Sequence, residues 1–191
     1  MGLLGNTGPI PLAGPSDISV IASRDNYVDF GHILVPATIQ GLVIKGEMEP
    51  DTQRLVAVTL ELADSVLQVS VFSSARSEEI WPEVREQLLS NFQAQGSVVE
   101  HSISSLGASI EVQVPNADGA VANVRFVGTD GPRWFLRGSI SGAALEDPQA
   151  NDVIDALYKS LVVDRGDDPM PPRELLSLKL PAGNVAPPRQ L

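Results

Sequence analysis

Hydrophobic and polar residues alternate along most of the middle of the chain, which is the period of β-strands with one buried face. The clearest example is the segment RLVAVTLEL (54–62), followed after two residues by SVLQVSVF (65–72). A two-residue link between alternating, Val-rich segments predicts a β-hairpin. In the second segment Leu67, Val69 and Val71 form the more consistent apolar set, so we expect them to face the core.

Further strands are expected on both sides of this hairpin, separated by Gly-, Asn- and Asp-containing turns. The three segments before it are 17–22, 28–35 and 39–46. The four segments after it are 97–104, 108–115, 120–128 and 132–141.

Two segments have apolar residues at helical spacing. The first is SEEIWPEVREQLLSNFQAQG (77–96), where Ser77 can cap the helix. A proline is tolerated only in the first turn, so either Pro82 lies near the first helical position or the turn at 77–81 is irregular. The second is 146–163, where Asp147 is expected as the N-cap and is followed by a proline at the first helical position.

The order of these elements predicts an α+β fold, with an antiparallel β-sheet and two main α-helices packed on one side of it. We expect an extended Gly/Pro arm over residues 1–16 and a single α+β domain over 17–164. Residues 165–191 are Pro-rich, and we expect an extended tail whose end is disordered.

The composition of the chain excludes several classes of binding partner and of chemistry. The 191 residues include 24 acidic and 13 basic side chains, and the net charge of -11 argues against nucleic acid or an anionic membrane as the partner. The absence of cysteine excludes disulfides and thiolate chemistry. No stretch approaches the roughly 20 apolar residues of a membrane helix, and the N-terminus lacks the pattern of a secretory signal. We therefore expect a cytoplasmic protein.

Signals of catalysis are weak. His32 and His101 have no sequence-local partner that would make either one a base or a metal ligand. Metal-binding motifs, a nucleophile elbow, a P-loop and a dinucleotide fingerprint are absent from the sequence. We expect no catalytic residue, no metal and no cofactor.

The most sharply patterned stretch is GPRWFLRG (131–138), which sets arginines beside aromatic residues in an acidic protein. If Arg125 and Arg137 pair across the turn, then Arg125, Arg133 and Arg137 share one face of the sheet. Such a strip could bind an anion or an acidic partner segment. The alternative, which we favour, is that carboxylates of the chain itself neutralise it. Trp134 is expected in the core rather than as a binding platform.

Both tails carry apolar residues that could dock on a partner or on the domain itself, and the sequence leaves these alternatives open. They are Leu3, Leu4 and Ile10 in the N-terminal arm, and Met170, Leu175 and Leu176 in the C-terminal tail.

Three blocks together resemble a mostly actinobacterial family, domain of unknown function 3710, over about residues 16 to 181. They are LVAVTLELADSVLQVSVFSSARSEEIWPEVREQL, VRFVGTDGPRWFLRGSISG and VVDRGDDPMPPRELLSLKLP. The resemblance implies a cytoplasmic actinobacterial protein and carries over no catalytic residue. The order of elements is also similar to the Mog1/PsbP-like fold, by topology alone, and that analogy implies binding or assembly roles.

We weigh three functions. The first, which we favour, is a non-catalytic interaction or assembly module that binds a protein partner through a sheet face or the tails. The second is a small anionic-ligand binder, or an enzyme not recognised from motifs, that uses Arg125, Arg133 and Arg137. The third is a homo-oligomeric structural protein that reaches a neighbouring copy through its N-terminal arm.

Overall fold

The computed structural model describes residues 14–182 and 186–190. Up to the first helix its elements are β1 (Ser16–Asp17), the 3-10 helix η1 (Ile18–Val20), β2 (Tyr27–Asp29), β3 (Ile33–Pro36), β4 (Val43–Met48), β5 (Leu55–Leu62) and β6 (Ser65–Ser73). They are followed by α1 (Trp81–Ala94), β7 (Val99–Ser104), β8 (Gly107–Pro115), β9 (Val121–Gly131) and β10 (Trp134–Gly142). The last elements are the 3-10 helix η2 (Ala143–Leu145), α2 (Pro148–Ser160), β11 (Val162–Val163) and β12 (Ala186–Gln190).

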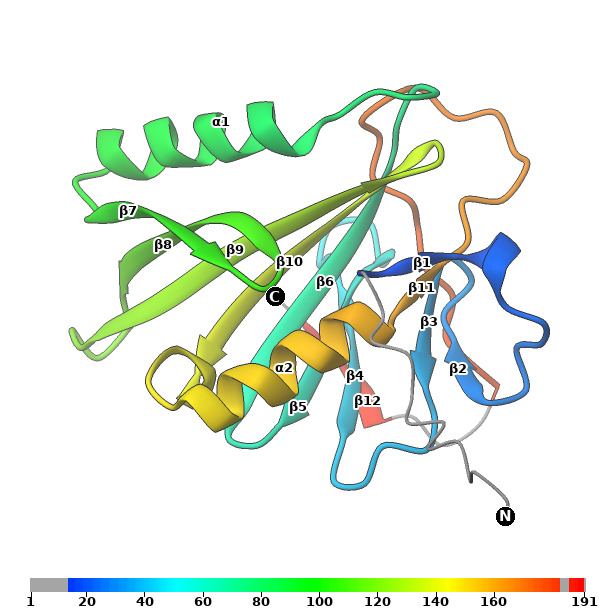
Figure 1. Cartoon of the computed structure of the whole chain (residues 1–191), viewed down its shortest axis with the longest axis horizontal. Helices are drawn as coiled ribbons and strands as arrows, with labels where there is room; N and C mark the ends of the chain where they lie inside the picture. Colours follow the sequence, from blue (N-terminus) through cyan, green and yellow to red (C-terminus); the bar gives the residue numbers. More distant parts are fainter. Residues whose placement is uncertain (1–13, 183–185, 191) are drawn as a thin grey trace, which may run out of the picture.

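The strands form two sheets (Figure 1). The large sheet has the order β12-β4-β5-β6-β10-β9-β8-β7, and the small sheet has the order β1-β11-β3-β2. All neighbours are antiparallel except β12 with β4 and β1 with β11, which are parallel. The expected α+β class with an antiparallel sheet and two main helices is confirmed.

The two helices lie on opposite faces of the large sheet (Figure 1), so the expectation that both pack on one side was wrong. Tyr158 of α2 donates a hydrogen bond to the Leu136 carbonyl oxygen at 3.2 Å, and its ring packs on the face that carries Leu136. The ring of Phe135, the neighbouring residue, packs instead with Trp81 of α1. Successive side chains of a strand point to opposite faces, so Leu136 and Phe135 of β10 pack against different helices.

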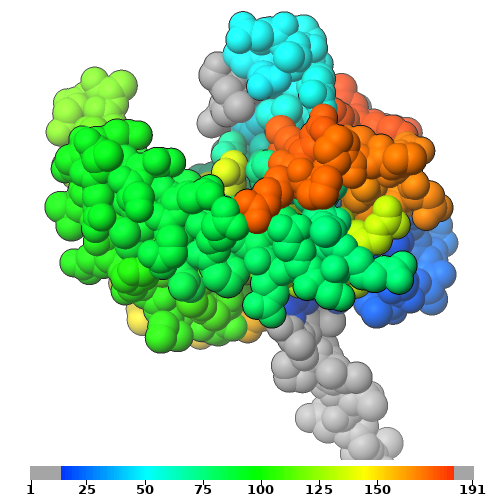
Figure 2. All heavy atoms as spheres, turned by 90° about the horizontal axis from the view of Figure 1, so that it is seen from above, coloured from blue at the N-terminus to red at the C-terminus, as the bar shows by residue number. Residues whose placement is uncertain are grey.

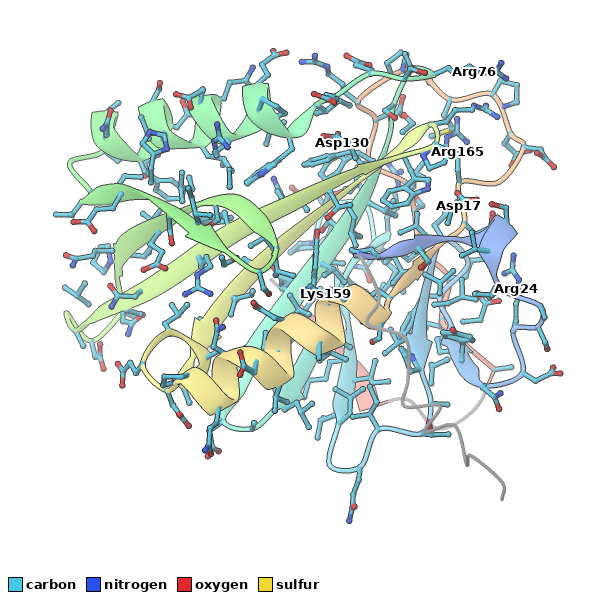
Figure 3. The ribbon with its side chains drawn as sticks, viewed as in Figure 1. Asp17, Arg24, Arg76, Asp130, Lys159 and Arg165 are labelled. Carbon is cyan, nitrogen blue, oxygen red and sulfur yellow. The ribbon has the colours of Figure 1, made fainter. Side chains whose placement is uncertain are left out.

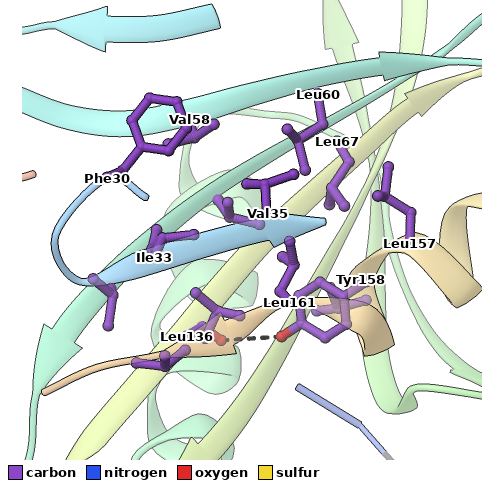
Figure 4. Close-up of a cluster of buried hydrophobic side chains, with 14 of the residues drawn as sticks. Phe30, Ile33, Val35, Val58, Leu60, Leu67, Leu136, Leu157, Tyr158 and Leu161 are labelled. Atoms are coloured by element: carbon purple, nitrogen blue, oxygen red, sulfur yellow. Dashed lines mark hydrogen bonds between the residues drawn. The ribbon is translucent and has the colours of Figure 1, made fainter. Parts of the chain in front are cut away.

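The main core lies between the large sheet, α2 and the small sheet (Figure 4). Phe30 and Ile33 of the small-sheet region meet Leu60 and Leu67 of the large sheet, and Leu157 of α2 closes the cluster. All five side chains are buried. A smaller apolar cluster lies on the other face, beneath α1.

The β5–β6 hairpin forms as predicted. Ala63 and Asp64 have φ angles of 51° and 54°, which is the left-handed conformation that a two-residue hairpin turn requires at both positions. Leu67, Val69 and Val71 are fully buried, which confirms the expected core face.

Helix α1 begins at Trp81, four residues later than expected. Ser77 does not cap it, because its φ of 62° places it in a left-handed turn outside the helix. A carboxylate from a distant strand does so instead. Oδ1 of Asp130 accepts a hydrogen bond from the Ile80 backbone N–H at 2.8 Å, and Oδ2 accepts one from the Trp81 N–H at 3.2 Å.

Helix α2 is capped as predicted. Asp147 accepts a hydrogen bond from the Gln149 N–H, and Pro148 is the first helical residue. The helix ends at Ser160 rather than at residue 163, because Val162 and Val163 turn into β11 and pair with β3.

The first strands differ from the predicted segments. Residues 18–20, expected within a strand, form η1, with Asp17 as its cap. The segment 28–35 is divided into β2 and β3 by a tight reversal at Gly31, whose φ is 86°. The third expected strand, 39–46, begins at Val43.

Residues 165–180 run along the domain without forming a helix or a named strand, and we call them the strap. Leu175 bridges to Phe72 of β6, and Leu178 bridges to Leu55 of β5. Leu176 is buried with 1% of its surface exposed, so the strap contributes to the core. Further on, residues 186–190, where the sequence led us to expect disorder, form β12 beside β4.

Candidate functional site

The register of the β9–β10 hairpin separates the three arginines of the expected strip. Arg137 pairs with Gly128, and Arg125 pairs with Ile140. The predicted Arg125–Arg137 pairing was therefore wrong by three residues, because the strands continue to residues 131 and 134 and the turn lies between them. An odd shift reverses the faces, so Arg125 and Arg137 lie on opposite sides of the sheet.

Arg125 lies on the α2 face and is already paired. Its Nε donates to Oε1 of Glu111 at 2.9 Å, and Nη1 donates to Oδ1 of Asn151 in α2 at 2.6 Å. It also lines a polar hollow of about 330 Å³ at the start of α2. Since a carboxylate and an amide already satisfy this guanidinium, Arg125 agrees with the internal-pairing hypothesis.

Arg133 lies in the hairpin turn with a φ of 62°, and its carbonyl oxygen accepts a hydrogen bond from the Ser74 N–H at 2.9 Å. Trp134 begins β10 with 1% of its surface exposed. Its indole Nε1 donates to Oδ2 of Asp17 at 2.8 Å. Burial raises the pKa of Asp17, but hydrogen bonds from Ser19 and Trp134 outweigh it, and the net shift is downward. Trp134 is thus a core residue that ties β10 to the edge of the small sheet.

The residues around GPRWFLRG also hold α1 in place. Asp130, which caps the helix, lies where the β9–β10 hairpin reaches the start of α1 (Figure 3). A Cβ at Gly128 would lie 2.4 Å from the Trp81 ring, and a Cβ at Gly131 would lie 2.1 Å from the Trp134 ring. Both glycines are therefore needed so that large rings can pack directly on the strand.

A half-enclosed pocket of about 230 Å³ lies between α1 and the large sheet. Phe135 is central to its floor, 5.9 Å from the Phe72 ring and 6.1 Å from the Trp81 ring between centroids. Its apolar walls come from α1 and its preceding residue, from β6 and from β10: Ile80, Val84, Leu88, Phe72 and Phe135. The pocket has the apolar lining that is typical of binding sites.

Arg137 is the cationic group of this pocket. Its guanidinium carbon lies 5.2 Å from the centroid of the Phe72 ring, in cation–π geometry. Burial lowers the pKa of Arg137 from its ordinary value. Among the residues that the structure describes, no carboxylate lies within 4 Å of it and no group hydrogen-bonds to its guanidinium. Arg137 therefore remains a partly dehydrated cation without a counter-ion from the described chain.

The rim of the pocket carries a second arginine that is fully paired. Arg173 of the strap lies 3.0 Å from Oε1 of Glu78, just before α1, and 2.7 Å from Oε2 of Glu83, in the first turn of α1. These hydrogen bonds lower the pKa of both glutamates and raise that of Arg173. In Figure 2 the orange strap lies against the green start of α1. The rim group carries a net charge of -1, so it supplies no free cation.

The apolar tail residues fall into two groups. Leu3, Leu4 and Ile10 lie outside the described residues. In the strap, Leu176 is buried, while Met170 and Leu175 are partly buried, and Met170 packs against the main core. The strap residues thus dock on their own domain, one of the two alternatives left open by the sequence.

The pocket walls were not among the predicted site residues, although the sequence carried a signal for them. Val84 and Leu88 belong to the apolar stripe of α1, and Phe72 points away from the core face of β6. An apolar stripe and an apolar residue on the second sheet face must meet where a helix covers that face. What the sequence could not supply was the side of the sheet on which α1 packs.

The part of the chain that the structure describes contains no group of three or more histidine and carboxylate side chains arranged to hold a metal ion. Neither of its α-helices is long and apolar enough to cross a membrane.

Residues 14–186 match the model of a family described as "Protein of unknown function (DUF3710)". Neither the curated proteins nor the solved structures include a match. The topological analogy to the Mog1/PsbP-like fold therefore stays a prediction. The family match spans most of the chain, including the capping Asp130, the Arg137 pocket and the strap, and the protein belongs to the DUF3710 family.

Proposed function

We propose that this protein is a non-catalytic interaction module that holds an apolar side chain of a protein partner in the pocket between α1 and the large sheet. The observation that carries the proposal is the pocket itself, which has apolar walls and opens to solvent beside an exposed helix. Its volume of about 230 Å³ is below the roughly 300 to 1,000 Å³ of sites for drug-sized molecules. That size suits one large side chain better than a cofactor.

The polar groups around the pocket also favour binding over catalysis. Besides Arg137 and Arg173 they are the amides Gln87 and Asn91. Arginine is not deprotonated in proteins, and an amide is a poor base, so none of the four is suited to general acid–base catalysis. The rim carboxylates of Glu78 and Glu83 are held by Arg173, which lowers their pKa and makes them weaker bases. We further propose a cytoplasmic location, in keeping with the acidic composition.

A pocket-filling variant tests the proposal. Val84→Trp places a large ring into the pocket from α1, and Ser90→Trp adds the same ring at an exposed position of the same helix. Random peptides displayed on phage are selected on the wild-type protein, and the affinities of the enriched peptides are measured for all three proteins. We expect the enriched peptides to share a bulky apolar residue. Their affinity should fall at least about 10-fold in Val84→Trp, since burying one such side chain is worth about 1.5–3 kcal/mol. Their affinity should not change in Ser90→Trp.

Two results would contradict the proposal. One is that no peptide is enriched over the starting library. The other is that enriched peptides bind Val84→Trp as tightly as the wild type, which would place their site elsewhere on the surface. Circular dichroism of both variants confirms beforehand that each is folded.

A further inference from the structure

We propose that Arg137 makes this pocket a receptor for a carboxylate attached to an apolar group, so that the partner segment presents a negative charge next to its anchoring side chain. This inference rests on the proposed function and adds the chemistry of the ligand. Its basis is that a cation with no counter-ion among the described residues lies beside apolar walls in one half-enclosed space.

The absence of a counter-ion for Arg137 from residues 14–182 and 186–190 is informative, because the chain has many more acidic than basic groups. It carries 24 acidic residues and 13 basic ones, and its other pocket-lining arginines are paired. Arg125 has Glu111, and Arg173 has Glu78 and Glu83. A charged group that is taken partly out of water without a partner costs free energy. Arg137 bears this cost, and an incoming anion would offset it.

A single negative charge suits this site better than a phosphate dianion. The walls are apolar, so the desolvation of a second negative charge would find no compensating group there. The rim offers none either, because Arg173 is already bound by two glutamates. A guanidinium also matches the planar geometry of a carboxylate with two parallel hydrogen bonds.

The ligand must also be apolar next to its charge. With a net charge of -11 the protein as a whole repels free anions. Contact with Phe72, Val84, Leu88 and Phe135 supplies the free energy that overcomes this repulsion. The two features together select an amphipathic carboxylate over an inorganic anion.

A matched pair of probes separates the charge from the apolar contact. The acid 3-phenylpropanoate and its neutral amide, 3-phenylpropanamide, have the same ring and nearly the same shape. Each is titrated into the full-length protein while the NMR signals of the Arg137 Nε–H and of the pocket methyl groups are followed. We expect the acid to bind at least about 10-fold more tightly than the amide, the factor that a charged hydrogen bond supplies.

Substitutions at Arg137 and Arg125 show which arginine causes the preference for the acid over the amide. Arg137→Met keeps the apolar stem without charge, and we expect it to bind the acid and the amide equally. Arg137→Lys keeps the charge and loses the planar fork, so the ratio should be intermediate. Arg125→Met removes an arginine from the opposite face and should leave the ratio unchanged. Circular dichroism and urea unfolding establish that each variant is folded.

A further pair of arms distinguishes the two sources of the carboxylate. A short peptide that ends in phenylalanine is compared as its free acid and its C-terminal amide. A capped peptide with an internal Asp-Phe step is compared with its Asn-Phe counterpart. If only the peptide with a free C-terminus binds more tightly than its amide, Arg137 binds a chain terminus. If only the Asp-Phe peptide binds more tightly than the Asn-Phe peptide, Arg137 binds an acidic side chain.

The outcomes separate this inference from the proposed function. If the wild type bound the acid and the amide equally, and Val84→Trp bound neither, the pocket would be an apolar site that does not recognise a carboxylate. A preference for the acid that persists in Arg137→Met would overturn the role of Arg137. Binding of neither probe at millimolar concentration would overturn the inference, whereas the peptide selection tests the proposed function independently.

Discussion

At the scale of single residues, Asp130 links two distant parts of the chain. Its carboxylate accepts hydrogen bonds from the backbone N–H groups of Ile80 and Trp81. These groups lie at the start of α1 and have no partner within the helix. It also places a negative charge at the positive end of the helix dipole. The side chain is 50 residues away from Ile80 in sequence, so local helix-start signals such as Ser77 could not reveal it.

We expect Asp130→Ala to lower the free energy of unfolding by about 1 to 2 kcal/mol, the usual cost of removing a helix cap. Asp130→Asn keeps one acceptor oxygen and loses the charge, so its loss should be smaller. Urea unfolding followed by circular dichroism measures both. The matched control is Asp51→Ala, which removes an exposed turn carboxylate. A loss as small as that of the control would show that Asp130 does not hold α1.

Contacts of single residues also explain the sharp pattern of GPRWFLRG. Gly131 leaves space for the Trp134 ring, Trp134 bonds to Asp17, and Phe135 forms the floor beneath α1. These roles are structural. Arg137 is different, because its guanidinium has no ionic partner among the described residues and faces a pocket. Within one short stretch, then, fold and proposed binding are assigned to different residues.

At the scale of elements, the alternation of hydrophobic residues and the residue types at turns and helix starts predicted the β5–β6 hairpin and the cap of α2 correctly. They failed for the β9–β10 register, where the turn was placed at residues 129–131. In β9 the adjacent residues Phe126 and Val127 are both apolar and lie on opposite faces, so the hydrophobic pattern of that strand does not fix the register. The positions of Arg125 and Arg137 therefore could not be derived from the sequence.

The strap is the second element whose role the sequence left open. Its composition resembles a Pro-rich tail, yet Leu176 reaches the main core and Leu175 bridges to Phe72. Leu176 and Leu178 alternate with polar residues, but so short a pattern does not show which gap in a distant core they fill. Only the assembled sheet shows that the gap exists.

We expect Leu176→Ala to destabilise the protein by about 2 to 5 kcal/mol, as in other large-to-small substitutions in a core. Leu180→Ala is the matched control, because that side chain is 55% exposed, and its effect should stay within about 0.5 kcal/mol. Urea unfolding of the two variants gives both values. Equal, small effects would mean that the strap is detached from the domain in solution.

At the scale of the whole molecule, the two faces of the large sheet carry separate apolar clusters. The larger joins the sheet to α2 and the small sheet, and the smaller lies beneath α1. Strand β10 contributes to both, Leu136 to one and Phe135 to the other. The capping bonds from Asp130 and the ion pairs of Arg173 add further links between α1 and the rest. Such connections predict a single cooperative unit rather than two independently stable layers.

The two tryptophans test this, because Trp81 reports on the cluster beneath α1 and Trp134 on the other face. Trp81→Phe leaves Trp134 as the sole tryptophan, and Trp134→Phe leaves Trp81, so the tryptophan fluorescence of each variant reports on one site. For each variant we expect the fluorescence and circular dichroism transitions in urea to coincide, because all layers unfold together. Comparing the two signals within one protein removes any effect of the substitution on stability. A Trp81 transition at lower urea than the loss of secondary structure would instead make α1 and its pocket a separate unit, able to open while the main core stays folded.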